Sequence, residues 1–367
     1  MSYVLRDYQQ KASDAAVSFF ANKTKRNNAI MVLPTGAGKS LVIADIASRL
    51  EGHTLVFQPS KEILEQNYLK LCSYGILDCS VYSASFGRKD ISRITFATIG
   101  SVKNHPELFQ HFRNIIIDEC HLVNPKEGMY KDFLTMLQCK VLGLTATPYR
   151  LSSSRDFGSM LKFITRTRPC VFSEVIYQVQ ISTLLDMGYL SKLNYYAMNP
   201  LGWNELNLKV NTTGADYTDK SVVKEYERID FYGFLVSIVR RLMNPKVGGK
   251  RKGILVFTRF LKEAQRLTQS IPGTAIVSGD TPKKERERIL EEFKAGEIPV
   301  VANVGVLTTG FDYPELDTIV MARPTMSLAL WYQIVGRAIR PHPTKEAGWI
   351  VDLCGNIKRF GEVKDLR

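Results

Sequence analysis

Short runs of apolar and β-branched residues recur along the chain, and each run ends in a polar or glycine-containing stretch. The runs cover 29–33, 54–57, 94–97, 114–117 and 141–144 in the first half, and 253–257, 274–277, 299–302, 318–321 and 349–352 in the second half. Runs of this length are typical of strands that are buried on both faces of a parallel sheet. Helical patterns separate many of them, so the sequence predicts two parallel-sheet α/β domains.

Two of the separating helices can be placed by their residues. The stretch 40–50 carries an apolar stripe at helical spacing. Thr281 and Pro282 predict the N-cap and the first residue of a second helix, whose apolar stripe includes Ile289 and Phe293.

Composition limits the class of protein. With 45% hydrophobic and 23% charged residues, the 367-residue chain has the composition of a globular protein rather than a disordered or fibrous one. Its length suits two domains, which we expect at 1–185 and 186–367, with an irregular insertion at about 200–230. No apolar run approaches the ~18 residues that span a bilayer, and the first residues contain no apolar signal core.

The cysteines point to a reducing compartment. None of the six forms a Cys-x-x-Cys pair, which a structural zinc site usually requires. We therefore expect free thiols, no zinc and a cytoplasmic protein. Because no apolar run is long enough to span a bilayer, we also expect no membrane partner.

The charge balance favours a polyanionic partner. Lys and Arg total 49 and Asp and Glu total 36, which gives a formal net charge of +13. Such a surplus indicates nucleic acid first and an anionic membrane surface second. Charge alone leaves open the alternative of a merely soluble basic surface.

A phosphate-binding loop is predicted directly after the first apolar run. The stretch reads Pro34, Thr35, Gly36, Ala37, Gly38, Lys39 and Ser40. Its glycines would let backbone N–H groups converge on phosphates, Lys39 would supply a charge, and Ser40 would bind magnesium. The strict pattern requires glycine where this chain has Leu33, so the match is to a variant. The alternative is a glycine turn before a core helix.

Two adjacent acids follow the run at 114–117. Asp118 would hold magnesium, and Glu119 would orient and deprotonate the attacking water. His121 could be read as a metal ligand, but beside a phosphate loop we expect it to help couple the two domains.

A pair of arginines occurs late in the chain. On a helix, Gln333, Arg337 and Arg340 would share one face, and both guanidinium groups could make bidentate bonds to a triphosphate. The alternative for this segment is a solvated basic helix face.

Together these stretches resemble the superfamily 2 helicases and translocases, and the order of the motifs matches from Leu5 to about Arg359. The resemblance implies two tandem RecA-like parallel-sheet domains that bind ATP and Mg²⁺ in a cleft between them. It implies nucleotide contacts at Arg6, Gln9, Gly310 and Asp312, and nucleic-acid contacts at Pro59, Ser60, Thr98, Arg259 and Thr308. Thr145, Ala146 and Thr147 resemble the motif that couples ATP to the strand.

A narrower resemblance is to RadD-type DNA-repair helicases, through 188–190 and 352–356. It implies DNA rather than RNA as the partner, a role in repair or recombination, and possible repair-protein partners. Three alternatives remain open at this point: a duplex translocase that does not separate strands, an ATP-gated clamp or sensor, and an RNA helicase.

The net charge generates a first prediction. If the protein binds single strands through the backbone and neutralises about 5 phosphates, log affinity should fall against log salt with a slope of about −3.5. Fluorescence anisotropy over a salt series measures the slope. A flat response would point to base stacking or to a partner other than nucleic acid.

Overall fold

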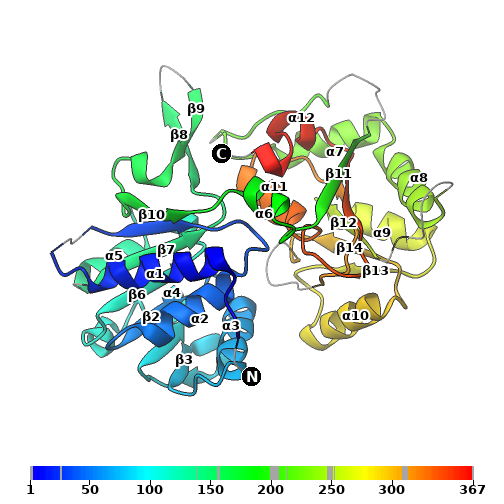
Figure 1. The fold of residues 1–367 in the computed structure, drawn as a ribbon. Helices are drawn as coiled ribbons and strands as arrows, with labels where there is room; N and C mark the ends of the chain where they lie inside the picture. The colour runs from blue at the N-terminus through cyan, green and yellow to red at the C-terminus, as the bar shows by residue number, and fades with distance from the viewer. Residues whose placement is uncertain are drawn as a thin grey trace. The chain divides into compact units, whose positions relative to one another are not determined.

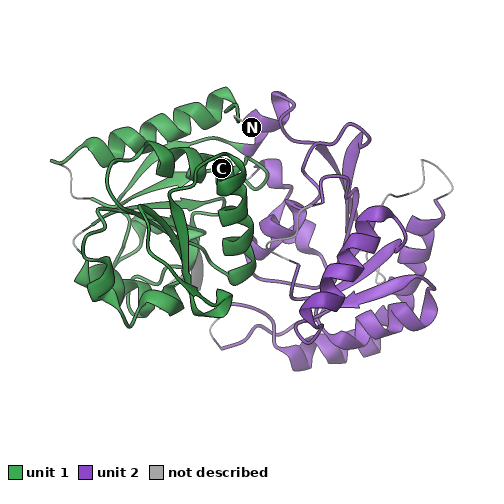
Figure 2. Ribbon diagram, turned by 90° about the horizontal axis from the view of Figure 1, so that it is seen from below, with its two compact units in different colours: residues 1–180 green, residues 181–367 purple. Residues whose placement is uncertain are grey.

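The chain divides into two compact units, residues 1–180 and residues 181–367, in a computed structural model (Figure 2). The structure describes residues 3–24, 27–137, 139–154, 158–198, 206–212, 214–245, 251, 253–307 and 313–365, with the backbone only for 151–154 and 158–160. Each unit is described by itself.

Among the described residues, unit 1 contains an eight-stranded sheet in the order β10-β1-β7-β6-β2-β5-β3-β4 (Figure 1). All its pairings are parallel except the one between β3 and β4. The strands are β1 (Ala29–Val32), β2 (Thr54–Phe57), β3 (Cys79–Ser83), β4 (Arg88–Lys89), β5 (Ile94–Ala97), β6 (Asn114–Asp118), β7 (Lys140–Thr145) and β10 (Glu174–Gln178).

Helices and a hairpin complete unit 1. The helices are α1 (Asp7–Ala21), α2 (Lys39–Arg49), α3 (Lys61–Ser73), α4 (Ile99–Val102) and α5 (Met129–Met136). The buried residues of α2 include Ile43, Ile46 and Ala47, which share one face of the helix and form the apolar stripe predicted within 40–50. The antiparallel pair β8 (Tyr149–Ser154) and β9 (Gly158–Phe163) forms a separate sheet that stands out from the rest of the unit in Figure 1.

Unit 2 contains a six-stranded sheet in its described part, in the order β11-β16-β15-β12-β14-β13, and every pairing is parallel. The strands are β11 (Lys192–Ala197), β12 (Ile254–Thr258), β13 (Thr274–Val277), β14 (Val300–Val304), β15 (Thr318–Ala322) and β16 (Ala347–Asp352). The helices are α6 (Ile181–Asp186), α7 (Asp219–Arg228), α8 (Phe231–Met243), α9 (Leu261–Ser270), α10 (Lys283–Ala295), α11 (Leu328–Val335) and α12 (Asn356–Phe360).

The predicted fold class is confirmed, because each apolar run overlaps a strand of one of the two sheets. Those runs formed the sheets because β-branched side chains pack well on both buried faces. Strands β3, β10 and β11 were not predicted, since polar residues interrupt their apolar pattern. Buried Ser80 of β3, for example, donates its hydroxyl to the Asp90 carbonyl at 2.9 Å.

One predicted helix start is wrong by a residue. Helix α10 begins at Lys283, and Pro282 occupies the N-cap position that Thr281 was expected to fill. The Thr281 hydroxyl instead accepts a hydrogen bond from the Ser278 N–H at 2.9 Å, which closes the turn before the helix. Of the insertion expected at about 200–230, α7 occupies 219–228, and 199–205 and 213 lie outside the described residues.

Within the described ranges, every helix is too short or too polar to cross a bilayer.

A close approach at Gly143 in β7 generates a stability prediction. A Cβ there would lie 2.6 Å from both Cβ and Sγ of Cys120, and 3.0 Å from the Phe172 ring. Gly143→Ala should therefore lower the free energy of unfolding by about 1–3 kcal/mol, as overpacking does. Gly100→Ala is the matched control, because nothing lies within 4 Å of its added Cβ. Urea denaturation measures both variants, and equal stability of Gly143→Ala and the wild type would contradict the packing described.

Candidate nucleotide-binding site

The predicted phosphate loop connects β1 to α2, and its backbone requires glycine at two positions. Gly36 and Gly38 have φ angles of 84° and 78°, in the left-handed region. A Cβ on Gly38 would also lie 2.5 Å from Nε2 of Gln9. Because α2 begins at Lys39, the N–H groups of its first residues lie at the end of this loop. A loop of this kind at a helix N-terminus suits an anionic ligand.

The start of α1 is fastened to the phosphate loop. Nε2 of Gln9 and the hydroxyl of Tyr8 both donate to the Ala37 carbonyl, at 2.9 and 2.8 Å. Oε1 of Gln9 accepts from the Arg6 N–H at 2.9 Å. The Gln9 amide therefore supports the loop in this structure, and the nucleotide contacts predicted for Gln9 and Arg6 stay predictions.

The acidic pair lies at the carboxyl end of β6, which is separated from β1 by β7 alone. Asp118 is buried, and its Oδ1 accepts from the Glu119 N–H at 2.9 Å. Glu119 has a left-handed backbone, with φ 49° and ψ 48°, which is strained for a residue other than glycine. Its Oε1 lies 3.0 Å from Nζ of Lys39, so the loop lysine and the predicted base form an ion pair.

Burial and charge separate the two carboxyl groups. Burial and the neighbouring Glu119 charge raise the pKa of Asp118. Burial alone would also raise the pKa of Glu119, but the Lys39 charge and His121 outweigh it and lower that pKa. Glu119 is therefore a carboxylate at neutral pH. The oxygens of Asp118 and Ser40, at the ends of β6 and of the phosphate loop, are the hard ligands that Mg²⁺ prefers.

His121 links the acidic pair to the segment at the end of β7. Its Nδ1 lies 2.9 Å from the Thr145 hydroxyl and 3.3 Å from Oε2 of Glu119. The Thr145 hydroxyl also accepts from the Thr147 N–H at 3.1 Å. Among the described residues, no group of three or more His, Cys, Asp or Glu side chains could hold a metal ion, so nothing there assigns His121 to zinc.

The nucleic-acid contacts predicted in unit 1 lie at the same edge of the sheet. Pro59 and Ser60 follow β2, Thr98 follows β5, and these strands are parallel neighbours. The Ser60 hydroxyl caps α3 by accepting from the Ile63 N–H at 3.3 Å, and the Thr98 hydroxyl lies 2.9 Å from that of Ser101. The structure thus brings these partly exposed residues together, while their contact with nucleic acid stays a prediction.

The Arg259 side chain makes ion pairs and hydrogen bonds with other residues of unit 2. Its guanidinium lies 3.1 Å from an Asp216 oxygen and 2.8 Å from an Asp219 oxygen, and it donates to the Tyr217 carbonyl at 2.7 Å. The side chain is only 9% exposed, so these contacts give it a structural task in unit 2. Thr308, Gly310 and Asp312 lie outside the described residues.

The shared helix face predicted for Gln333, Arg337 and Arg340 is wrong. Helix α11 ends at Val335, so Gln333 lies on it while both arginines lie in residues 336–340, which we call the arginine loop. The chain leaves the helix there because Ala338 and Ile339 are fully buried and the loop carbonyls bond to other segments. Burial lowers the pKa of Arg340, which nonetheless stays charged at neutral pH.

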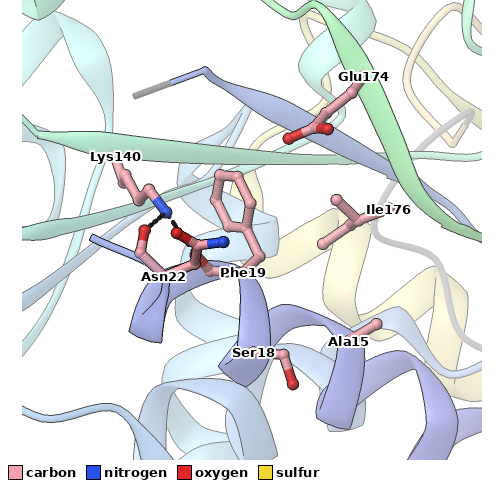
Figure 3. Close-up of a pocket in the computed structure, with 7 residues that line it drawn as sticks. All are labelled: Ala15, Ser18, Phe19, Asn22, Lys140, Glu174 and Ile176. Atoms are coloured by element: carbon pink, nitrogen blue, oxygen red, sulfur yellow. Dashed lines mark hydrogen bonds between the residues drawn. The ribbon is translucent and has the colours of Figure 1, made fainter. Parts of the chain in front are cut away.

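A pocket in unit 1 lies away from these residues (Figure 3). It is lined by Ala15, Ser18 and Phe19 of α1, by Asn22 directly after this helix, by Lys140 of β7, and by Glu174 and Ile176 of β10. Nζ of Lys140 donates to the carbonyls of Phe19 and Asn22 and so caps the end of α1. The pocket is at the amino ends of β7 and β10, whereas the phosphate loop follows the carboxyl end of β1.

Comparison with known families places one match in each unit. Residues 2–150 match the family described as "Type III restriction enzyme, res subunit". Residues 236–342 match the family described as "Helicase conserved C-terminal domain".

Individual relatives have low sequence identity to this chain but match almost its whole length. The chain is 25% identical to the putative ATP-dependent helicase IRC3 of Saccharomyces cerevisiae, covering 96% of this chain and 52% of that protein. It is 26% identical to the DNA 3'-5' translocase XPB2 of Sulfurisphaera tokodaii, covering 92% and 78%. This chain thus spans only about half the length of IRC3, and 63% of a 51.5 kDa Lactococcus phage protein.

Solved structures share the fold. A fragment of a putative HsdR subunit of a type I restriction enzyme from Vibrio vulnificus matches with a TM-score of 0.71 and 22% identity, over 98% of this chain and 66% of that one. The type ISP restriction-modification enzyme LlaBIII matches with a TM-score of 0.70 and 18% identity, over 96% and 28%. The chain is thus similar to the res subunit of type III restriction enzymes over 2–150 and to the helicase conserved C-terminal domain over 236–342, and it shares the fold of these solved structures.

Proposed function

We propose that the protein is a nucleic-acid-dependent ATPase that acts as a DNA helicase or translocase. The observation that carries the proposal is the Lys39–Glu119 ion pair, made by a strained acid at the end of β6 and the first residue after a glycine loop. Relatives named as DNA translocases and helicases support the choice of DNA.

The residues of unit 1 suit binding and cleavage of a triphosphate. The phosphate loop and the start of α2 would bind the phosphates. The Lys39 ammonium group would then leave its ion pair with Glu119 and pair with the phosphates instead. Glu119, thus released, would orient a water and accept its proton. Ser40 and Asp118 would hold Mg²⁺, which neutralises charge on the β- and γ-phosphates.

Unit 2 would complete the site when ATP and a strand bind together. We place Gln333, Arg337 and Arg340 against the triphosphate, with Gly310 and Asp312 beside the nucleotide. The strand backbone would be held by Pro59, Ser60, Thr98, Arg259 and Thr308. The ion pairs with Asp216 and Asp219 would position the Arg259 guanidinium for this contact. Loss of the γ-phosphate would then open the cleft between the units, and repeated cycles would move the protein along DNA.

We further propose a role in DNA repair or recombination, which the RadD-type resemblance implies. The competing functions are a translocase that displaces obstacles, an ATP-gated clamp and an RNA helicase. Three assays separate them on DNA and RNA substrates: ATP hydrolysis, displacement of a paired strand, and displacement of a bound third strand. A helicase separates paired strands, a translocase displaces only the third strand, and a clamp hydrolyses ATP without either.

Binding and hydrolysis should be separable within unit 1. Lys39→Ala should abolish both, because it removes the charge that cradles the phosphates. Glu119→Gln should bind ATP normally but lose at least about 10²-fold in turnover, since it keeps the shape of the base without its proton affinity. Lys131→Ala, at an exposed lysine of α5, is the control. Filter binding and phosphate release measure the two steps, and a wild-type rate for Glu119→Gln would refute the assigned base.

The arginines should act only when nucleic acid is present. Arg340→Ala should leave ATP affinity without DNA almost unchanged, because the phosphates are then held by unit 1 alone. It should reduce DNA-stimulated hydrolysis by about 10³-fold, as removal of an arginine finger does. Stimulated hydrolysis at the wild-type rate in Arg340→Ala would exclude a transition-state role for this residue.

A further inference from the structure

Three successive carbonyls of the arginine loop accept hydrogen bonds from two residues outside it. Nζ of Lys345 donates to the Ala338 carbonyl at 3.0 Å. Ser191 donates its N–H to the Ile339 carbonyl at 2.7 Å and its hydroxyl to the Arg340 carbonyl at 3.0 Å. The backbone between Arg337 and Arg340 is therefore held from both sides.

Lys345 also holds a second segment. The same ammonium group donates to the Pro314 carbonyl at 2.8 Å and to the Leu316 carbonyl at 3.2 Å. This segment follows directly on 308–312, where the resemblance places the nucleotide contacts Gly310 and Asp312. All three N–H donors of the ammonium thus go to backbone carbonyls of the arginine loop and of the segment that follows the predicted nucleotide contacts Gly310 and Asp312.

The position of Lys345 is itself fixed. Its side chain enters from a short turn closed by the Lys345 N–H, which donates to the His342 carbonyl at 3.0 Å. The residue is only 8% exposed, and lysine is seldom buried unless its charge has partners. Nearby, Gly348 of β16 lets the loop pack closely, since a Cβ there would lie 2.6 Å from the Ala338 carbonyl oxygen.

We infer that Lys345 is a positioning residue for ATP hydrolysis, because its buried ammonium group holds the arginine loop and segment 313–317 in one arrangement. The inference rests on the proposed function, in which Arg337 and Arg340 contact the triphosphate. Lys345 itself touches no reacting atom. A buried methionine would fill the same space without tying the two segments together.

The protonation state of Lys345 offers a second readout. Burial lowers its pKa to about 8, with Asp317 opposing this shift and Arg340 adding to it. The neutral amine has only two N–H donors for three carbonyls, so one tie is lost as the pH rises through 8. DNA-stimulated kcat in the wild type should therefore fall above about pH 8.

Lys345→Met tests the inference in the full chain. We expect its DNA-stimulated kcat to fall by about 10²-fold, as misplacement of catalytic groups by about 1 Å does, while KM for ATP stays within about twofold. The high-pH fall in kcat should disappear. Lys262→Met is the matched control, because Lys262 is exposed and pairs with Glu227 on another helix. It should keep the wild-type kcat and pH profile.

Hydrogen exchange gives a readout that does not depend on activity. Amides of 336–340 should exchange faster in Lys345→Met, while those of β12 and β15 keep their protection. If circular dichroism shows that Lys345→Met does not fold, Lys345→Gln replaces it, and the wild type alone still decides the question. Between pH 7 and 9, after correction for intrinsic exchange, protection of 336–340 should fall in the wild type, and unchanged protection would overturn the inference.

The outcomes separate the two proposals. Wild-type kcat in Lys345→Met together with an inactive Arg340→Ala would overturn the positioning role and leave the proposed function standing. Full stimulated activity in Arg340→Ala would instead refute the assigned role of this arginine. Unchanged protection of the loop in Lys345→Met would then overturn the structural tie as well.

Discussion

The ion pair between Lys39 and Glu119 is the interaction on which the site in unit 1 depends. It joins the first residue of α2 to the end of β6, which is possible because β1, β7 and β6 are parallel neighbours. The left-handed backbone of Glu119 and the contact with His121 fix the acid in place. Strain of this kind persists where surrounding contacts over-determine it, as they do here. The ion pair keeps the Lys39 ammonium group beside the phosphate loop.

The same turn connects the site to the rest of unit 1. His121 reaches the Thr145 hydroxyl, and the His121 carbonyl accepts from the Arg150 guanidinium at 2.9 Å. Arg150 is the second residue of β8, so one turn contacts the start of α2, the end of β7 and the hairpin of β8 and β9. A short hydrogen-bonded path therefore connects the acidic pair to the end of β7 and to the hairpin. In unit 2, Ser191 and Lys345 do the corresponding work of fixing a loop.

Much of the fold could be predicted from the sequence because buried parallel strands require contiguous apolar residues. The phosphate loop and acidic pair were also predictable, since glycines, a lysine and acids at these spacings have few other uses. Polar strands such as β10 were not predicted, because incompletely buried strands do not need a contiguous apolar run. The arginine helix was predicted wrongly because spacing alone cannot show that Ala338 and Ile339 leave the helix to become buried.

The structural roles of two basic residues could not be predicted, because their partners lie far away along the chain. The tasks of Arg259 and Lys345 depend on residues such as Asp216 and Pro314, which are 43 and 31 positions away. Lys345 lies in a stretch of Pro, His and Thr that reads as an ordinary exposed loop. A buried lysine among backbone carbonyls leaves no pattern in the sequence, because carbonyls belong to every residue. Only the folded chain shows it.

The most direct test of the account is the rate of ATP hydrolysis by the full chain as single-stranded DNA is added, with duplex DNA, forked DNA and RNA in parallel. The account predicts a low rate without nucleic acid and a saturable rise with DNA, larger than the rise with RNA. A rate that is the same with and without every nucleic acid would contradict it.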